Sequence, residues 1–125
     1  MIALSTFAIA AGVKPRITGI YSDLRYNQEG GDLLGTEIFI VYADHDDYFA
    51  FVQCWEGGTT PPVVVPVKST EDMISFTVPE PSLGAGSYEG RVTEAGFSGV
   101  LTRVPAGGEA KKEHFDLKRK KSHWQ

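Results

Sequence analysis

Cysteine is almost absent from this chain: its 125 residues include a single one, Cys54. An internal disulfide is therefore excluded, and the fold has to rely on a packed core, which a domain of this length is large enough to form. Long apolar runs are also absent, since no stretch approaches the roughly 20 consecutive apolar residues of a membrane-spanning helix. The content of 42% hydrophobic and 22% charged residues is ordinary for a single globular domain.

Sustained helical periodicity is missing as well. No stretch of 11 or more residues keeps a 3.6-residue apolar repeat, and the 14 glycines and 7 prolines interrupt almost every candidate. Short runs of β-branched and aromatic residues recur instead, separated by turn residues. The expected strands cover residues 17–25, 35–43, 48–56, 63–68, 73–79, 87–93, 97–104 and 114–118.

These eight expected strands follow one another with mostly short turns, a pattern typical of an up-and-down antiparallel sheet. An open sheet of this size leaves two free edges, and the chain offers no helix to cover either face. We therefore predict an all-β fold, a single antiparallel up-and-down barrel of about eight strands with little or no helix. Tyr88-Glu89-Gly90 and Phe97-Ser98-Gly99 each place an aromatic residue two positions before a glycine, which favours local bending of neighbouring strands.

The two ends of the chain differ from its body. Residues 1–13 are apolar, and Ala8-Ile9-Ala10 has the shape of an export cleavage site; a hydrophobic N-terminal strand or tail is the alternative. Residues 111–121 hold six basic and two acidic side chains and therefore carry a net charge of +4. Because the whole chain carries −4, residues 1–110 carry −8. An acidic body argues against nucleic-acid binding. We expect an N-terminal segment 1–16, a barrel domain 17–117, a basic tail 118–125 and a periplasmic or secreted location, with the cytoplasm as the alternative.

A family resemblance rests on three features: Gly19-Ile20-Tyr21 in the first strand, the aromatic-x-glycine strands, and the basic cluster after the last strand. Together they resemble calycin-type barrels, whose members include lipocalins and avidins. The chain is also similar to uncharacterised bacterial exported proteins of about this length that end near Trp124. It departs from lipocalins, which carry tryptophan where Tyr21 stands and have a helix, and from avidins, which use several tryptophans to hold biotin. The resemblance implies a barrel with an apolar cavity and no particular ligand.

No pattern in the sequence indicates catalysis or a cofactor. Cys54 lacks a thiol-protease signature, the serines stand in no nucleophile-elbow context, and the histidines show no metal spacing. The cluster Asp44-His45-Asp46-Asp47 could supply oxygen ligands to a hard cation, but it has the composition of a solvated hairpin turn. We expect no catalytic residue, no metal and no cofactor.

The hairpin 35–56 is apolar on both of its faces, unlike residues 73–78, where one face is polar. One face has to line the barrel interior, and the other needs a cover, either the N-terminal segment or a second copy of the chain. If the interior is open, a small apolar or mixed-polarity molecule is the expected ligand; if it is filled, self-association through this hairpin is expected. The candidate ligand-binding residues are Phe49, Phe51, Gln53, Trp55, Tyr21 and Tyr88.

Overall fold

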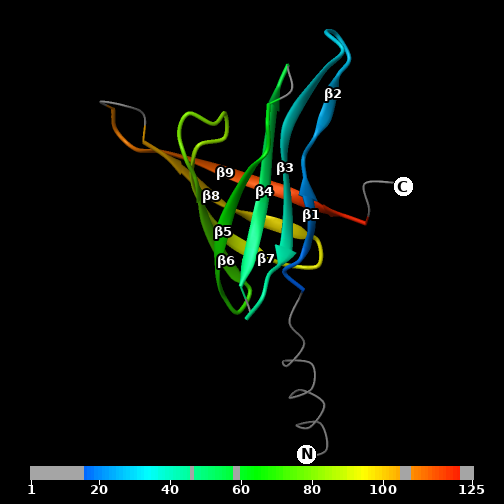
Figure 1. Ribbon diagram of the computed structural model, residues 1–125. Helices are drawn as coiled ribbons and strands as arrows, with labels where there is room; N and C mark the ends of the chain where they lie inside the picture. The colour runs from blue at the N-terminus through cyan, green and yellow to red at the C-terminus, as the bar shows by residue number, and fades with distance from the viewer. Residues whose placement is uncertain (1–15, 46, 58–59, 105–107, 122–125) are drawn as a thin grey trace, which may run out of the picture.

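The computed structural model describes residues 16–45, 47–57, 60–104 and 108–121, which form nine antiparallel strands and no helix (Figure 1). The strands are β1 (Gly19–Ser22), β2 (Arg25–Asn27), β3 (Asp32–Tyr42), β4 (Tyr48–Glu56), β5 (Val63–Thr70), β6 (Met73–Val78), β7 (Gly86–Val92), β8 (Gly96–Arg103) and β9 (Lys111–Lys120). Within this part of the chain, no segment has the helical length and apolar character of a membrane span.

Strand β1 closes the barrel, because it pairs with β9 on one side and with β3 on the other. From β3 to β9 each strand pairs with the next one along the chain, so eight strands form a closed up-and-down wall. The predicted fold class is therefore confirmed. Closure at β1 gives β3 and β9 a partner where an open sheet would leave their edges exposed.

The first predicted strand, residues 17–25, is interrupted rather than continuous. β1 and β2 share one register against β3, with Ser22 opposite Glu37 and Arg25 opposite Leu34. Between them the Ser22 hydroxyl accepts a hydrogen bond from the Leu24 amide. The ladder is broken locally because side chains take over its hydrogen bonds. Among the described strands, β2 pairs only with β3, and this hairpin projects beyond the barrel (Figure 1).

The last strand is longer than predicted, since β9 runs from Lys111 to Lys120 rather than over residues 114–118. The expected boundary between the barrel and a basic tail at residue 118 therefore falls inside β9. The N-terminal apolar segment, with its export-like Ala8-Ile9-Ala10, and the end of the chain near Trp124 lie outside the described residues.

Strands β7 and β8 approach each other closely at two facing glycines. Gly90 lies directly opposite Gly99, and a Cβ atom on either one would overlap a backbone carbonyl of the other strand. The ring of Phe97 lies against Gly90, where its Cε1 would be 2.9 Å from an added Cβ. The aromatic-x-glycine pattern thus marks a close approach of the two strands, and the local bending that the sequence favours stays a prediction.

Candidate functional site

The barrel interior is filled by side chains from all eight strands of the wall. One buried cluster comprises Tyr21, Ile38, Ile40, Ala50, Val52, Val65, Val67, Ile74, Phe76, Val78, Tyr88, Val92, Phe97, Leu101 and Leu117. Its centre is aromatic: the Phe76 and Tyr88 rings stack at 4.9 Å, and Phe97 lies 4.8 Å from Phe115 and 6.1 Å from Tyr21, measured between centroids. An eight-stranded barrel is narrow enough for such side chains to occupy its lumen.

The six candidate ligand-binding residues do not form one site. Tyr21 and Tyr88 belong to the buried interior, whereas Phe49 and Phe51 point outward and alternate with the buried Ala50. Phe49 and Phe51 therefore lie on the outer side of the wall, and Tyr21 and Tyr88 lie on its inner side. Whether any of these residues binds a ligand stays a prediction.

Gln53 and Trp55 also face outward and are half-buried. The Gln53 amide donates a hydrogen bond to the Thr60 carbonyl at 2.5 Å, and the Thr60 hydroxyl donates one to the Cys54 carbonyl at 2.5 Å. These two hydrogen bonds tie β4 to Thr60, which lies shortly before β5.

A contiguous apolar surface covers the outside of β3, β4 and β5. Its two cross-strand rows are Phe39, Phe51 and Val64, and next to them Val41, Phe49 and Pro66. We call these six residues the outer apolar face. The exposed fractions of Phe39, Phe49, Phe51 and Val64 are 41%, 37%, 40% and 52%, although each residue is large and apolar. Adjacent exposed residues of this kind mark an interaction surface more often than a solvated wall.

A small hollow lies at one end of the barrel. It has a volume of about 210 Å³ and is lined by Asp23, Thr36, Arg103, Glu113 and neighbouring residues of β7, β8 and β9. Arg103 Nε lies 3.6 Å from the Glu113 carboxylate, beyond hydrogen-bond distance. A second depression of about 330 Å³ shares these two residues. The two depressions share the charged side chains of Arg103 and Glu113 at this end of the barrel, which we call the barrel mouth.

Tyr88 and Cys54 lie together beneath this mouth. The Tyr88 hydroxyl donates a 2.8 Å hydrogen bond to the Gly84 carbonyl, and Cys54 Sγ lies 3.6 Å from the Thr36 hydroxyl. Burial, with the nearby Cys54 as a smaller cause, raises the pKa of Tyr88 far above its ordinary value. Among the described residues, no hydrogen bond joins Cys54 to a histidine or a carboxylate.

The buried tyrosines predict a loss of stability in alkali. The folded-state pKa of Tyr88 is raised above the unfolded value near 10. The contribution of Tyr88 to the free energy of unfolding is therefore complete below pH 10 and decreases as pH rises further. In Tyr88→Phe we expect the free energy of unfolding to decrease less steeply above pH 10. The slope should be smaller than in the wild type by at most about 1.4 kcal/mol per pH unit. Urea denaturation between pH 8 and 11 measures this. Tyr26→Phe, at a side chain that is 68% exposed, is the control and should leave the profile unchanged.

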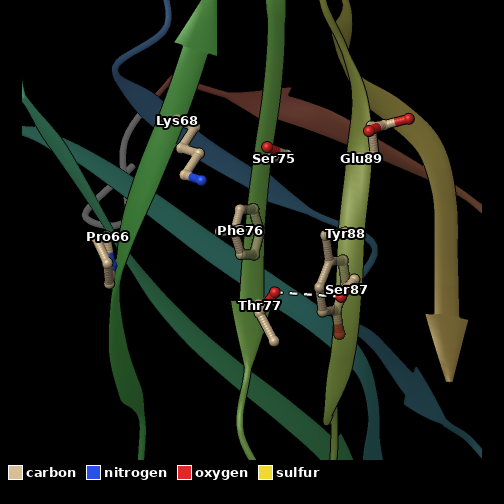
Figure 2. Close-up of a pocket in the computed structure, with 8 residues that line it drawn as sticks. All are labelled: Pro66, Lys68, Ser75, Phe76, Thr77, Ser87, Tyr88 and Glu89. Atoms are coloured by element: carbon tan, nitrogen blue, oxygen red, sulfur yellow. Dashed lines mark hydrogen bonds between the residues drawn. The ribbon is translucent and has the colours of Figure 1, made fainter. Parts of the chain in front are cut away.

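A third hollow lies on the outer wall, over β5, β6 and β7 (Figure 2). Its volume is about 420 Å³, and its outward-facing side chains are Pro66, Lys68, Ser75, Thr77, Ser87 and Glu89. The hydroxyls of Thr77 and Ser87 are 3.2 Å apart and hydrogen-bonded. No sequence-based prediction falls on this groove, although the proline inside the expected strand 63–68 is a signal for it.

The acidic turn after β3 shows no metal-binding geometry in its described part. His45 Nε2 lies 3.2 Å from the Asp44 carboxylate, and both side chains are exposed. The described residues contain no group of three or more histidine, cysteine or acidic side chains that could hold a metal ion. Asp46 lies outside those residues.

Comparisons with protein families, with curated proteins and with solved structures give no match to this chain. The closed antiparallel barrel is compatible with a calycin-like fold. Two of the three features behind that resemblance also meet in space: the Arg119 guanidinium of the basic cluster lies over the Tyr21 ring, 4.9 Å from its centroid.

Proposed function

We propose that this protein is a non-enzymatic interaction protein that self-associates through the outer apolar face. The observation that carries this proposal is the pairing of a filled interior with two adjacent rows of exposed apolar side chains. Ile38, Ile40, Ala50 and Val52 already supply the core contribution of β3 and β4. The outward-facing side chains of the same strands are therefore not needed to fill the core, and three of them are exposed phenylalanines.

A second copy of the chain fits this surface best. None of the six residues carries a charge, so the surface is its own chemical complement, and sheets pack face to face through such rows of side chains. A symmetric dimer, the commonest assembly of identical chains, places the same face on both sides of the contact. The surface has a polar margin, with Lys68 on β5 and the Glu37–Lys120 ion pair at 3.9 Å beside β3. An apolar centre with a polar rim is the usual anatomy of an interface.

Replacing Phe51 with lysine tests the proposal, because Phe51 lies in the middle strand of the face. We expect Phe51→Lys to weaken self-association at least about thirtyfold, since a lysine there would be buried without a partner in the contact. Light scattering and sedimentation velocity over a range of protein concentrations measure the change. Circular dichroism checks that the variant keeps its β-sheet.

Ser98→Lys is the matched control, because Ser98 faces outward on β8, outside the outer apolar face. It should self-associate like the wild type. Val64→Lys is a second variant within the face and should behave like Phe51→Lys. A wild-type protein that stays monomeric at all concentrations would contradict the proposal, as would equal association of Phe51→Lys and wild type.

Binding of a small molecule of mixed polarity at the barrel mouth is a second candidate function, in keeping with a calycin-like barrel. The two adjoining depressions around Arg103 and Glu113 support it, since they place opposite charges beside the apolar Leu101 and Phe115. Native mass spectrometry of the purified protein tests for a bound species.

A further inference from the structure

The barrel wall has an incomplete seam between β5 and β6. Their ladder comprises three residue pairs, Lys68 with Ser75, Ser69 with Ile74 and Thr70 with Met73. The next hydrogen-bonded pair in this register would join Pro66 to Thr77. Pro66 has no backbone N–H, so the ladder ends there, and proline inside a sheet is confined to such edges. Figure 2 shows β5 and β6 diverging from Lys68 and Ser75 toward Pro66 and Thr77.

The backbone groups at this seam are oriented to pair with an added strand. The two-residue turn Glu71-Asp72 makes Thr70 and Met73 a hydrogen-bonded pair. Because bonding direction alternates along an antiparallel strand, Val64 on β5 and Thr77 on β6 also direct their N–H and C=O groups toward the seam. Among the described residues, Val64 and Thr77 have ladder partners only on their other sides, in β4 and β7.

The groove over the seam combines apolar surface from Pro66, Phe76 and Tyr88 with hydroxyl groups, and it has a cation, Lys68, at its closed end. The hydroxyls of Ser75, Thr77 and Ser87 line it. The Lys68 side chain extends over the gap between β5 and β6, whereas the Glu89 carboxylate points away from β6 (Figure 2). No ion pair within the described residues involves Lys68. A negatively charged group entering the groove would meet this ammonium group and the neighbouring hydroxyls.

We propose that the β5–β6 seam binds the free carboxyl terminus of an extended polypeptide. The bound strand hydrogen-bonds through its main chain to Val64 or Thr77, and its terminal carboxylate pairs with Lys68. Strand addition to an exposed edge and capture of a terminal carboxylate are both established modes of peptide recognition. The seam closes at Lys68 and Ser75, so a strand that lies within it has to end at that point, which is why a chain terminus fits better than an internal segment.

Two fluorescein-labelled pentapeptides, Thr-Val-Thr-Val-Val with a free carboxylate and the same peptide with a C-terminal amide, test the proposal by fluorescence anisotropy. Alternating β-branched residues favour the extended conformation. We expect saturable binding of the acid and at least about tenfold weaker binding of the amide, because a charge-assisted hydrogen bond is lost. Lys68→Met should remove this difference, and Lys68→Arg should keep it. Hydrogen exchange at the Val64 and Thr77 amides should slow when the acid binds.

Lys112→Met, which removes an exposed lysine from β9, is the control and should bind both peptides like the wild type. Equal binding of acid and amide, unchanged selectivity in Lys68→Met, or no saturable binding of either peptide would each overturn the proposal. Repeating the titration with Phe51→Lys separates the seam from self-association, since that variant should still bind the acid.

Discussion

Gly99→Ala should lower the free energy of unfolding by about 3 kcal/mol or more, which is at the upper end of single-residue effects. A Cβ atom at Gly99 would overlap the Glu89 carbonyl oxygen and approach the backbone of Gly90. Both obstacles belong to the main chain of β7, so no flexible side chain can move aside. The strands would have to separate at this close contact, and their hydrogen bonds would be strained. Urea and thermal denaturation measure the loss, for which we expect a melting temperature at least about 8 °C lower.

Gly30→Ala is the control for this prediction. A Cβ atom at Gly30 would meet the Asp32 carboxylate at 3.0 Å, and this is the mobile end of an exposed side chain. Its effect should stay within about 0.5 kcal/mol. If Gly99→Ala were as stable as Gly30→Ala, the contact of β7 and β8 would not depend on close packing at the facing glycines.

The sequence predicts the barrel because its signals are local. The turns at Glu71-Asp72 and after Thr93 separate alternating runs, and the wall follows from their order. The break after Ser22 depends on hydrogen bonds to a distant strand: the Asp23 carboxylate accepts one from the Thr36 amide at 2.7 Å. A contact over 13 residues has no local signature, which is why β1 and β2 were expected as one strand.

Which face of a strand points into the barrel is harder to predict from the sequence than where the strand begins and ends. In the hairpin of β3 and β4 the side chains on both faces are apolar, so the two-residue periodicity does not indicate which face points inward. Size decides between them: Ala50 and Val52 occupy the lumen, and Phe49 and Phe51 stay outside. The lumen of an eight-stranded barrel has limited volume, and Tyr21, Phe76, Tyr88 and Phe97 from other strands already occupy much of it. That balance depends on all strands together and cannot be inferred from one hairpin.

Arg119→Met should also destabilise the fold strongly, by about 2–4 kcal/mol, because this side chain ties the closing strand to its neighbours. Its guanidinium donates hydrogen bonds to the carbonyls of Arg16, Thr18 and Thr93 at 2.7, 3.1 and 3.1 Å, respectively. It also lies over the Tyr21 ring, where a cation–π contact adds further stabilisation. Removing it leaves three carbonyls without this partner at the point where β1 joins β9.

The same contacts explain why Gly19 and Tyr21 occur together with a basic last strand. A Cβ atom at Gly19 would lie 2.9 Å from Arg119 Nη1, so glycine leaves room for the guanidinium while Tyr21 supplies the ring beneath it. Arg119→Lys should recover little stability, because one ammonium group cannot reproduce the planar fork that reaches three carbonyls. Lys118→Met is the control: its ion pair with Asp116 is exposed and should contribute less than about 1 kcal/mol. Chemical denaturation of the three variants measures the difference, and full recovery by Arg119→Lys would show that positive charge alone, rather than the fork, holds the barrel closed.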